Sequence, residues 1–205
     1  MIMGVAERKE REKLQMKVLI KNAALKLFLR DGIAGTSIRS IAGEIKYSPA
    51  TIYLYYRDKD ELLYEVQADA YLRLLEAFRQ HADSTLPLER LRQICVTYIS
   101  FGLANPELYD LMFIMRSPMN VDEKIHRTNG GDSLAYLADC LSDCILENLL
   151  TIDDLQTAVL QVWSTAHGLV SLDLRRRLNH MSITHEEIPG MLLSSIENYV
   201  RSITR

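Results

Sequence analysis

The sequence is poor in residues that mark several common protein classes. Its 205 residues include 3 cysteines, 5 prolines, 9 glycines and 1 tryptophan. The cysteines Cys95, Cys140 and Cys144 are too few and too odd in number for a disulfide framework. No run of about 18 apolar residues is free of charge, and the first residues carry charges where a signal peptide is apolar. We therefore expect an all-α protein that stays in the cytoplasm and has no contact with a membrane.

The two parts of the chain differ in charge. Residues 1–60 contain 12 Lys and Arg against 7 Asp and Glu, whereas residues 61–205 contain 12 against 20. The formal net charge of −3 hides this division. A basic first part followed by an acidic remainder favours contact of the first part with a polyanion. Charge alone leaves open that the basic residues only form a solvated surface.

Apolar periodicity predicts helices along most of the chain. We expect them at about 7–31, 37–44, 49–56, 59–82, 88–104, 106–116, 121–149, 152–178 and 185–203. The first helix carries a buried stripe formed by Ile20, Ala23, Ala24, Leu27 and Phe28, and Gly32 is expected to end it.

Two short helices are predicted to follow across a tight turn. Ser37 offers a capping hydroxyl to the first, and Ser48-Pro49 begins the second with a cap and a proline at the first helical position. Asp58 and Glu61 form a capping-box-like start for the long helix that follows. This arrangement is the helix-turn-helix plan, with the motif at about 37–56.

The second short helix fits a DNA major groove, which is about 12 Å wide. We expect its small N-terminal residues to approach the base edges, while Tyr56 packs in the core beside Ile52. The predicted phosphate contacts are Thr36, Tyr53, Tyr55 and Lys59, and the predicted base contacts are Arg39, Tyr47, Ala50 and Thr51. Ser37, Lys46, Ser48 and Pro49 complete the predicted DNA-binding set.

Five motifs carry a more specific signal. They are Ile20-x-x-Ala23-Ala24-x-x-Leu27-Phe28, Gly32, Thr36-Ser37-Ile38-Arg39-x-Ile41-Ala42, Ser48-x-x-Thr51-Ile52-Tyr53-x-Tyr55-Tyr56 and Lys59-Asp60-Glu61-Leu62. Together they resemble the N-terminal domain of TetR/AcrR-type transcriptional regulators. The resemblance implies a DNA-binding domain at 14–74, a ligand-binding and dimerisation domain at 75–205, about nine helices, and a homodimer formed through the last two.

Two positions depart from the family pattern. Lys46 stands where the family usually has a glycine, so either Lys46 adopts a left-handed conformation or the turn differs. Ser40 stands where the family often has an acidic residue. We therefore expect the reciprocal half of the capping box to be missing and the first short helix to fray.

The second part of the chain contains no catalytic or cofactor motif. We expect no enzyme activity, no cofactor and no metal. One alternative is an all-α metal-binding protein or enzyme that uses Cys140 and Cys144 with His126, His167, His180 or His185, although small buried core residues explain the cysteines better. A second alternative is a helical adaptor that has lost DNA binding, for which Lys46 is the support.

The last two helices are apolar on two adjacent faces. The helix at 152–178 carries two adjacent apolar stripes. The first is formed by Leu155, Val159, Val162, Ala166 and Leu169, and the second by Trp163, His167, Val170 and Leu174. One face can pack in the subunit and the other against a second copy, which predicts a two-fold dimer. A central position of both helices in a monomer is the alternative. The predicted interface residues are Leu155, Val159, Val162, Ala166, Leu169, Ile188, Leu192, Ser195 and Tyr199.

Two further motifs are Asn105-Pro106-Glu107-Leu108-Tyr109-x-Leu111-Met112-Phe113 and Trp163-x-x-x-His167-Gly168-Leu169. They resemble a C-terminal subclass of the same family that is named for its Trp-His-Gly signature. The predicted pocket is rich in methionine and aromatic residues, namely Phe101, Met112, Phe113, Met115, Met119, Tyr136 and Trp163. His167 is expected to hydrogen-bond a ligand or a neighbouring helix carbonyl.

These features predict a ligand-responsive transcriptional regulator. We expect a repressor that binds a palindromic operator as a homodimer and is released by a small, largely apolar effector.

Overall fold

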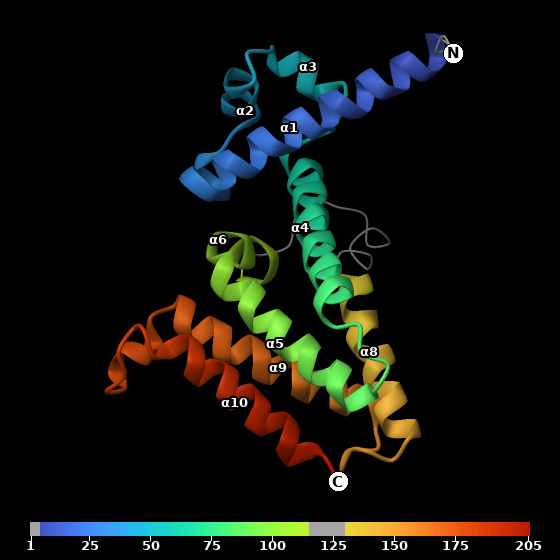
Figure 1. Ribbon diagram of the computed structural model, residues 1–205. Helices are drawn as coiled ribbons and strands as arrows, with labels where there is room; N and C mark the ends of the chain where they lie inside the picture. Colours follow the sequence, from blue (N-terminus) through green and yellow to red (C-terminus); the bar gives the residue numbers. More distant parts are fainter. Residues whose placement is uncertain (1–4, 115–129) are drawn as a thin grey trace. The chain divides into compact units, whose positions relative to one another are not determined.

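The computed structural model describes residues 5–114 and 130–205, which are almost entirely helical (Figure 1). The α-helices are α1 (Val5–Gly35), α2 (Ile38–Glu44), α3 (Pro49–Tyr53), α4 (Lys59–His81), α5 (Pro87–Ala104), α6 (Pro106–Tyr109), α8 (Gly131–Leu146), α9 (Leu155–Leu174) and α10 (Ile188–Ile203). A π-helical turn η1 (Asp110–Ile114) follows α6, and a 3₁₀-helix η2 (Arg177–His180) follows α9. The predicted all-α class is confirmed.

The chain forms two compact units. The first contains residues 5–70 and 111–114 of the described chain, and the second contains Tyr71–Asp110 and Gly130–Arg205. The division falls inside α4, so this one helix continues from the first unit into the second.

The core of the first unit is formed by α1 with α2 and α3. The predicted stripe of α1 is confirmed, because Ile20, Ala23, Ala24, Leu27 and Phe28 are all buried. Gly32 interrupts α1 with φ of 72° and ψ of 166°, a combination open to glycine and strained for other residues. Ion pairs from Lys17 to Glu65 at 3.0 Å and from Lys21 to Asp69 at 2.7 Å tie α1 to α4.

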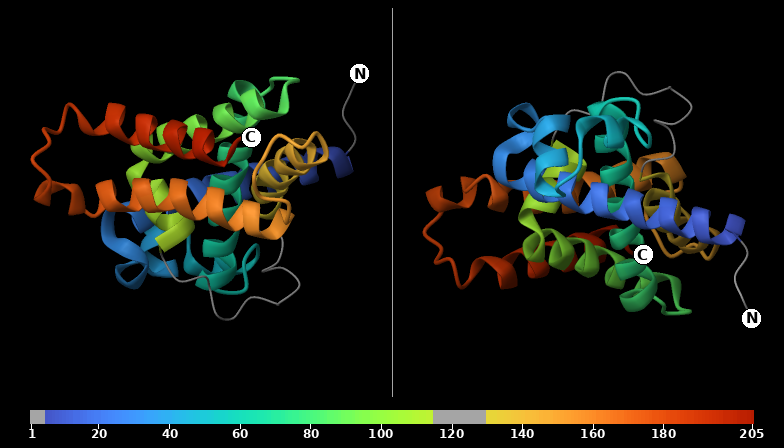
Figure 2. Two further views of the ribbon diagram at one scale, coloured as in Figure 1. Left: turned by 90° about the horizontal axis from the view of Figure 1, so that it is seen from below. Right: turned by 90° about the horizontal axis from the view of Figure 1, so that it is seen from above.

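The second unit is built around α5, which contacts α8, α9 and α10. Helices α9 and α10 lie side by side (Figure 2). Gly102 allows α5 and α9 to approach closely, because a Cβ atom there would lie 2.6 Å from Cγ1 of Val170. Among the described residues, no helix combines the length and apolar character needed to cross a membrane.

Candidate functional site

Helix α2 begins with a complete capping box made of two serines. The Oγ of Ser37 accepts a hydrogen bond from the Ser40 amide at 3.1 Å, and the Oγ of Ser40 accepts one from the Ser37 amide at 2.9 Å. The expectation that Ser40 leaves the box half formed is therefore wrong. A serine hydroxyl at this position reaches the backbone as a carboxylate does, because both accept from the same N–H.

The turn between α2 and α3 contains Lys46 in a left-handed conformation, with φ of 60°. The amide of Lys46 donates to the carbonyl of Gly43 at 3.2 Å, and that of Tyr47 donates to Ala42 at 2.9 Å. Two alternatives were open for this turn, and the structure shows the first: Lys46 adopts the left-handed conformation that the family's usual glycine would adopt. This conformation is unfavourable for a lysine.

Helix α3 is fixed at its start by a cap and along its inner side by core packing. The Ser48 Oγ accepts from the Thr51 amide at 3.2 Å, and Pro49 occupies the first turn. Ile52 and Tyr56 are 0% and 1% exposed, which confirms that Tyr56 belongs to the core. The Tyr56 hydroxyl donates a hydrogen bond to the Glu65 carboxylate. Burial of the ring and the nearby negative charge of Glu65 raise the pKa of Tyr56.

The outer side of this motif presents large side chains to solvent. Tyr53 is 56% exposed, Tyr47 is 46% exposed and Leu54 is 79% exposed. Arg39, Lys46, Ser48 and Ala50 are also exposed, while Pro49, Thr51 and Tyr55 are partly exposed. Leu54 lies four residues after Ala50 in helical backbone, which puts both on one face. Leu54 was not among the residues predicted to contact DNA, although its spacing from Ala50 places it on the same exposed face.

Two of the predicted phosphate contacts have hydrogen-bond partners within the chain. Thr36 is 2% exposed, and its hydroxyl donates to the carbonyl of Gly32 at 2.8 Å. The ammonium group of Lys59 donates to the carbonyls of Ile33 at 2.7 Å and Thr36 at 3.0 Å. Thr36 is therefore removed from the DNA-facing set, because its hydroxyl is buried, and Lys59 closes the end of α1 against the start of α4.

A buried polar cluster lies in the second unit. The Tyr109 hydroxyl is 2.7 Å from Nδ1 of His167 and 3.0 Å from the Tyr98 hydroxyl, and the Tyr109 and His167 rings stack at 5.5 Å. Trp163 packs edge-on against His167 at 6.4 Å. Burial lowers the pKa of His167 and raises that of Tyr109 to about 12. The tyrosine hydroxyls are partners of His167 that the sequence did not predict.

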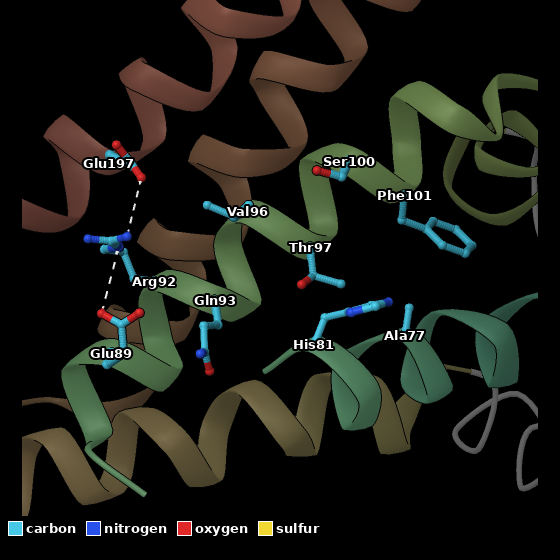
Figure 3. Close-up of a pocket in the computed structure, with 10 residues that line it drawn as sticks. All are labelled: Ala77, His81, Glu89, Arg92, Gln93, Val96, Thr97, Ser100, Phe101 and Glu197. Atoms are coloured by element: carbon cyan, nitrogen blue, oxygen red, sulfur yellow. Dashed lines mark ion pairs between the residues drawn. The ribbon is translucent and has the colours of Figure 1, made fainter. Parts of the chain in front are cut away.

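A groove of about 590 Å³ opens elsewhere in the second unit (Figure 3). The ends of Arg92 and Glu197 meet at one side of it, where their charged groups are 3.7 Å apart, and Glu89 lies 3.8 Å from Arg92. Phe101, Ala77 and His81 lie at the other side. The lining residues are Ala77, His81, Glu89, Arg92, Gln93, Val96, Thr97, Ser100, Phe101 and Glu197.

The residues predicted to form the ligand pocket are distributed over several places. Phe101 lines the groove, whereas His167 belongs to the polar cluster, and Trp163, which is 36% exposed, packs against His167. Tyr136 stacks on Phe78 at 5.9 Å and donates to the Ala82 carbonyl at 2.9 Å. Met112 and Phe113 belong to the first unit, and Met115 and Met119 lie outside the described residues.

The predicted dimer residues divide between the inner and outer faces of α9 and α10. Val162, Ala166, Ile188 and Leu192 are at most 4% exposed within the single chain. These four are corrected to core residues, because they already pack inside their own subunit. Leu155, Val159, Leu169, Ser195 and Tyr199 retain exposed surface. The outer face of α9 also carries Leu160, 63% exposed, which the apolar stripes did not include.

Among the described residues, the cysteines and histidines do not gather into a metal site. Within residues 5–114 and 130–205, no group of three or more His, Cys, Asp or Glu side chains is arranged to hold a metal ion. Cys95, Cys140 and Cys144 are all buried, as expected for core positions, and His126 lies outside the described range.

Two known protein families match the two parts of the sequence. Residues 20–66 match the family described as bacterial regulatory proteins, tetR family, and residues 91–194 match the tetracyclin repressor-like C-terminal domain. The regulator HbdR of Aromatoleum sp. is 32% identical over 109 residues, which cover 52% of this chain and 47% of HbdR. The nicotine-responsive repressor HdnoR of Paenarthrobacter nicotinovorans is 31% identical over 64 residues, 31% of this chain and 33% of HdnoR. The chain thus spans less than half the length of these curated relatives.

The fold as a whole also has solved counterparts. A TetR family transcription regulator from Marinobacter aquaeolei VT8 superposes with a TM-score of 0.70 at 19% identity, covering 96% of this chain and 98% of that one. The helix-turn-helix geometry and the matched families over both parts of the sequence show that this chain belongs to the TetR family of bacterial transcriptional regulators.

Proposed function

We propose that the protein binds operator DNA through the outer face of α2, the Lys46 turn and α3. The observation that carries this proposal is the contrast between Tyr53, 56% exposed, and Tyr56, 1% exposed, three positions apart. An exposed tyrosine beside a rigidly held core residue presents its hydroxyl to a phosphate at a fixed position. Arg39, Tyr47, Ala50 and Thr51 would then face the bases, and the thymine methyl group suits Ala50.

The DNA-bound form is a homodimer, assembled through the outer faces of α9 and α10. Exposed apolar side chains on α9 include Leu160 and Trp163, 63% and 36% exposed. A Cβ atom at Gly168 or Gly190 would meet nothing within 4 Å, so a second pair of helices could approach closely at both places. A two-fold pair of subunits fits a palindromic site, with recognition helices about 34–36 Å apart.

The ligand-binding and dimerisation domain predicted at 75–205 would hold a small effector that releases the DNA. The groove beside Phe101 offers an apolar wall next to charged and hydroxyl groups. The relative HdnoR is a nicotine-responsive repressor, which favours repression as the mode of action. Because α4 continues from one unit to the other, it would carry the change between them. This activity belongs in the cytoplasm, where the DNA is.

Fluorescence anisotropy tests the proposal. The purified protein is titrated into labelled DNA from upstream of its own gene and into scrambled DNA, at two salt concentrations. We expect about 10³-fold tighter binding to the specific DNA, a steep salt dependence and two subunits per site. If selection from genomic fragments also yields no specific binder, the proposal fails and the alternative of an adaptor without DNA binding is favoured.

A further inference from the structure

The side of α3 that faces away from the core is apolar. Ile52 is 0% exposed and marks the inner side of this helix. Ala50 and Leu54 each lie two positions from Ile52, a rotation of about 200°, so both lie within about 20° of the line directly opposite it. Leu54 is 79% exposed, and Ala50 is exposed as well. The part of α3 that projects farthest from the core therefore consists of an alanine and a leucine side chain.

The side chains of Ala50 and Leu54 cover neighbouring parts of the surface. Leu54 is the C-cap of α3 and still has helical backbone, with φ of −73° and ψ of −18°. Side chains of a helix lean towards its N-terminus, so the patch that Leu54 covers lies over the preceding turn, where Ala50 is. The two side chains thus form one apolar surface, the α3 ridge.

The polar groups of α3 are used elsewhere in the motif. The Ser48 and Thr51 hydroxyls are 3.0 Å apart and hydrogen-bond each other, and the Ser48 Oγ also accepts from the Thr51 amide at 3.2 Å. The third polar side chain of residues 48–54 is Tyr53, which the proposed function places on a phosphate. These seven residues include no Arg, Lys, Asn, Gln, Asp or Glu, the residue types that make specific hydrogen bonds to guanine, adenine and cytosine. A base edge that meets the α3 ridge therefore finds no hydrogen-bond partner there.

The major groove of DNA offers one apolar group, the 5-methyl group of thymine. Contact between this methyl group and an exposed leucine removes apolar surface of both partners from water, which is favourable. The other base edges present only hydrogen-bonding groups, and the ridge would displace water from these groups without replacing its hydrogen bonds. The α3 ridge therefore matches thymine better than any other base.

We propose that Leu54 is a specificity-determining residue that contacts the 5-methyl group of a thymine in each operator half-site, while Ala50 contacts a neighbouring one. This inference rests on the proposed function and adds a requirement on the DNA, namely thymine at the positions that α3 meets. Reading of bases through hydrogen bonds is then left to residues outside α3, such as the exposed Arg39 of α2.

Deoxyuridine tests the inference, because it pairs as thymidine does and lacks only the 5-methyl group. The operator is first obtained by selection from genomic fragments, and each thymine of a half-site is then replaced in turn. Anisotropy titrations give the affinity of the protein for each duplex. One buried methyl group contributes about fourfold to affinity, so at least one replacement should weaken binding about fourfold. Replacement of thymines outside the half-site should leave the affinity unchanged.

Variants then assign the methyl contact to Leu54. In Leu54→Ala, the ratio of affinities for the thymine and deoxyuridine duplexes should fall from about four to about one at the position that Leu54 meets. Leu54→Met keeps an apolar side chain of similar size and should retain part of this preference. Tyr53→Phe is the matched control, since it should weaken binding to both duplexes and leave their ratio unchanged. Urea denaturation verifies that each variant is folded.

Each failure has a distinct result. Specific binding that no deoxyuridine replacement weakens would overturn the inference and leave the proposed function intact. An undiminished preference for thymine at every position in Leu54→Ala would likewise overturn the role of Leu54. If selection yields no specific DNA, the proposed function fails and the inference fails with it.

Discussion

The ammonium group of Lys59 donates a hydrogen bond to the carbonyl oxygen of Ile33 at 2.7 Å, which joins the first turn of α4 to the end of α1. A second hydrogen bond to the Thr36 carbonyl at 3.0 Å strengthens this link. The lysine of the Lys59-Asp60-Glu61-Leu62 motif therefore holds the end of α1 against the start of α4.

Replacing Lys59 should reveal this structural role. Lys59→Met removes both charged hydrogen bonds and leaves two carbonyls without their donor, so we expect a loss of about 2 kcal/mol of unfolding free energy. Urea denaturation measures it. Unchanged stability combined with weaker DNA binding would instead indicate that Lys59 acts as a phosphate contact.

Tyr53 and Tyr56 form a matched pair for testing DNA contact. Tyr53→Phe removes an exposed hydroxyl, so it should weaken binding to specific and scrambled DNA alike, by about tenfold, with unchanged stability. Tyr56→Phe removes a buried hydroxyl that donates to Glu65 at 3.3 Å and should leave DNA affinity nearly unchanged. Anisotropy titrations compare the two, and equal effects would refute the assignment of Tyr53.

The turn residue Lys46 offers a stabilising substitution. Its φ of 60° suits glycine, so Lys46→Gly should relieve strain and raise the free energy of unfolding by about 0.5–1 kcal/mol. Lys46→Val should lower it, because a β-branched residue is disfavoured at positive φ. Thermal unfolding of the three proteins tests this order.

Replacing either of two glycines by alanine should change the stability in opposite directions. Gly102 lies in the close contact between α5 and α9, whereas Gly43 has open space around it. Gly102→Ala would place Cβ 2.6 Å from Val170 and 3.1 Å from Tyr109, and we expect it to cost about 1–3 kcal/mol. Gly43→Ala in α2 meets nothing within 4 Å and should stabilise by about 0.5–1 kcal/mol. Adding Val170→Ala to Gly102→Ala should recover part of the loss. A double variant with simply additive losses would show that the two residues do not compete for space.

His167 predicts a pH dependence of stability. Burial lowers its pKa in the folded protein below the ordinary value of 6.5, so the unfolded chain binds a proton first as the pH falls. The stability that the neutral His167 contributes to the folded protein is fully present above about pH 6.5 and is lost as the pH falls below this value. In the protonated ring, Nδ1 could only donate a hydrogen bond to the Tyr109 hydroxyl, which lies 2.7 Å away. Urea denaturation from pH 7.5 to 5 should show a smaller decline for His167→Gln, and parallel curves would exclude His167 as the cause.

The sequence was sufficient to predict helices because apolar residues repeat at helical spacing, as Ile20, Ala24 and Leu27 do. It was also sufficient for Tyr56, which shares the inner side of the motif with Ile52. The roles of side-chain hydroxyls were harder to predict. Thr36 can in principle donate a hydrogen bond to a phosphate, and only the fold shows that its hydroxyl donates to the Gly32 carbonyl.

The inner and outer faces of α9 and α10 could not be separated by periodicity alone. Val162 and Leu160 are both apolar, yet one is 2% and the other 63% exposed. Both faces of such a helix are apolar when one packs in its own chain and the other meets a partner. The neighbours of each residue decide the assignment, and those depend on contacts between segments distant in sequence.

The serine pair that caps α2 has an electrostatic consequence. A carboxylate at position 40 would cap the helix equally well, but it would place a negative charge on the side of the motif that carries Arg39. The hydroxyl of Ser40 makes the same hydrogen bond at 2.9 Å without a charge. Approach of DNA phosphates to this surface therefore meets no repulsion from the cap, and acidification cannot disrupt the cap by protonating it.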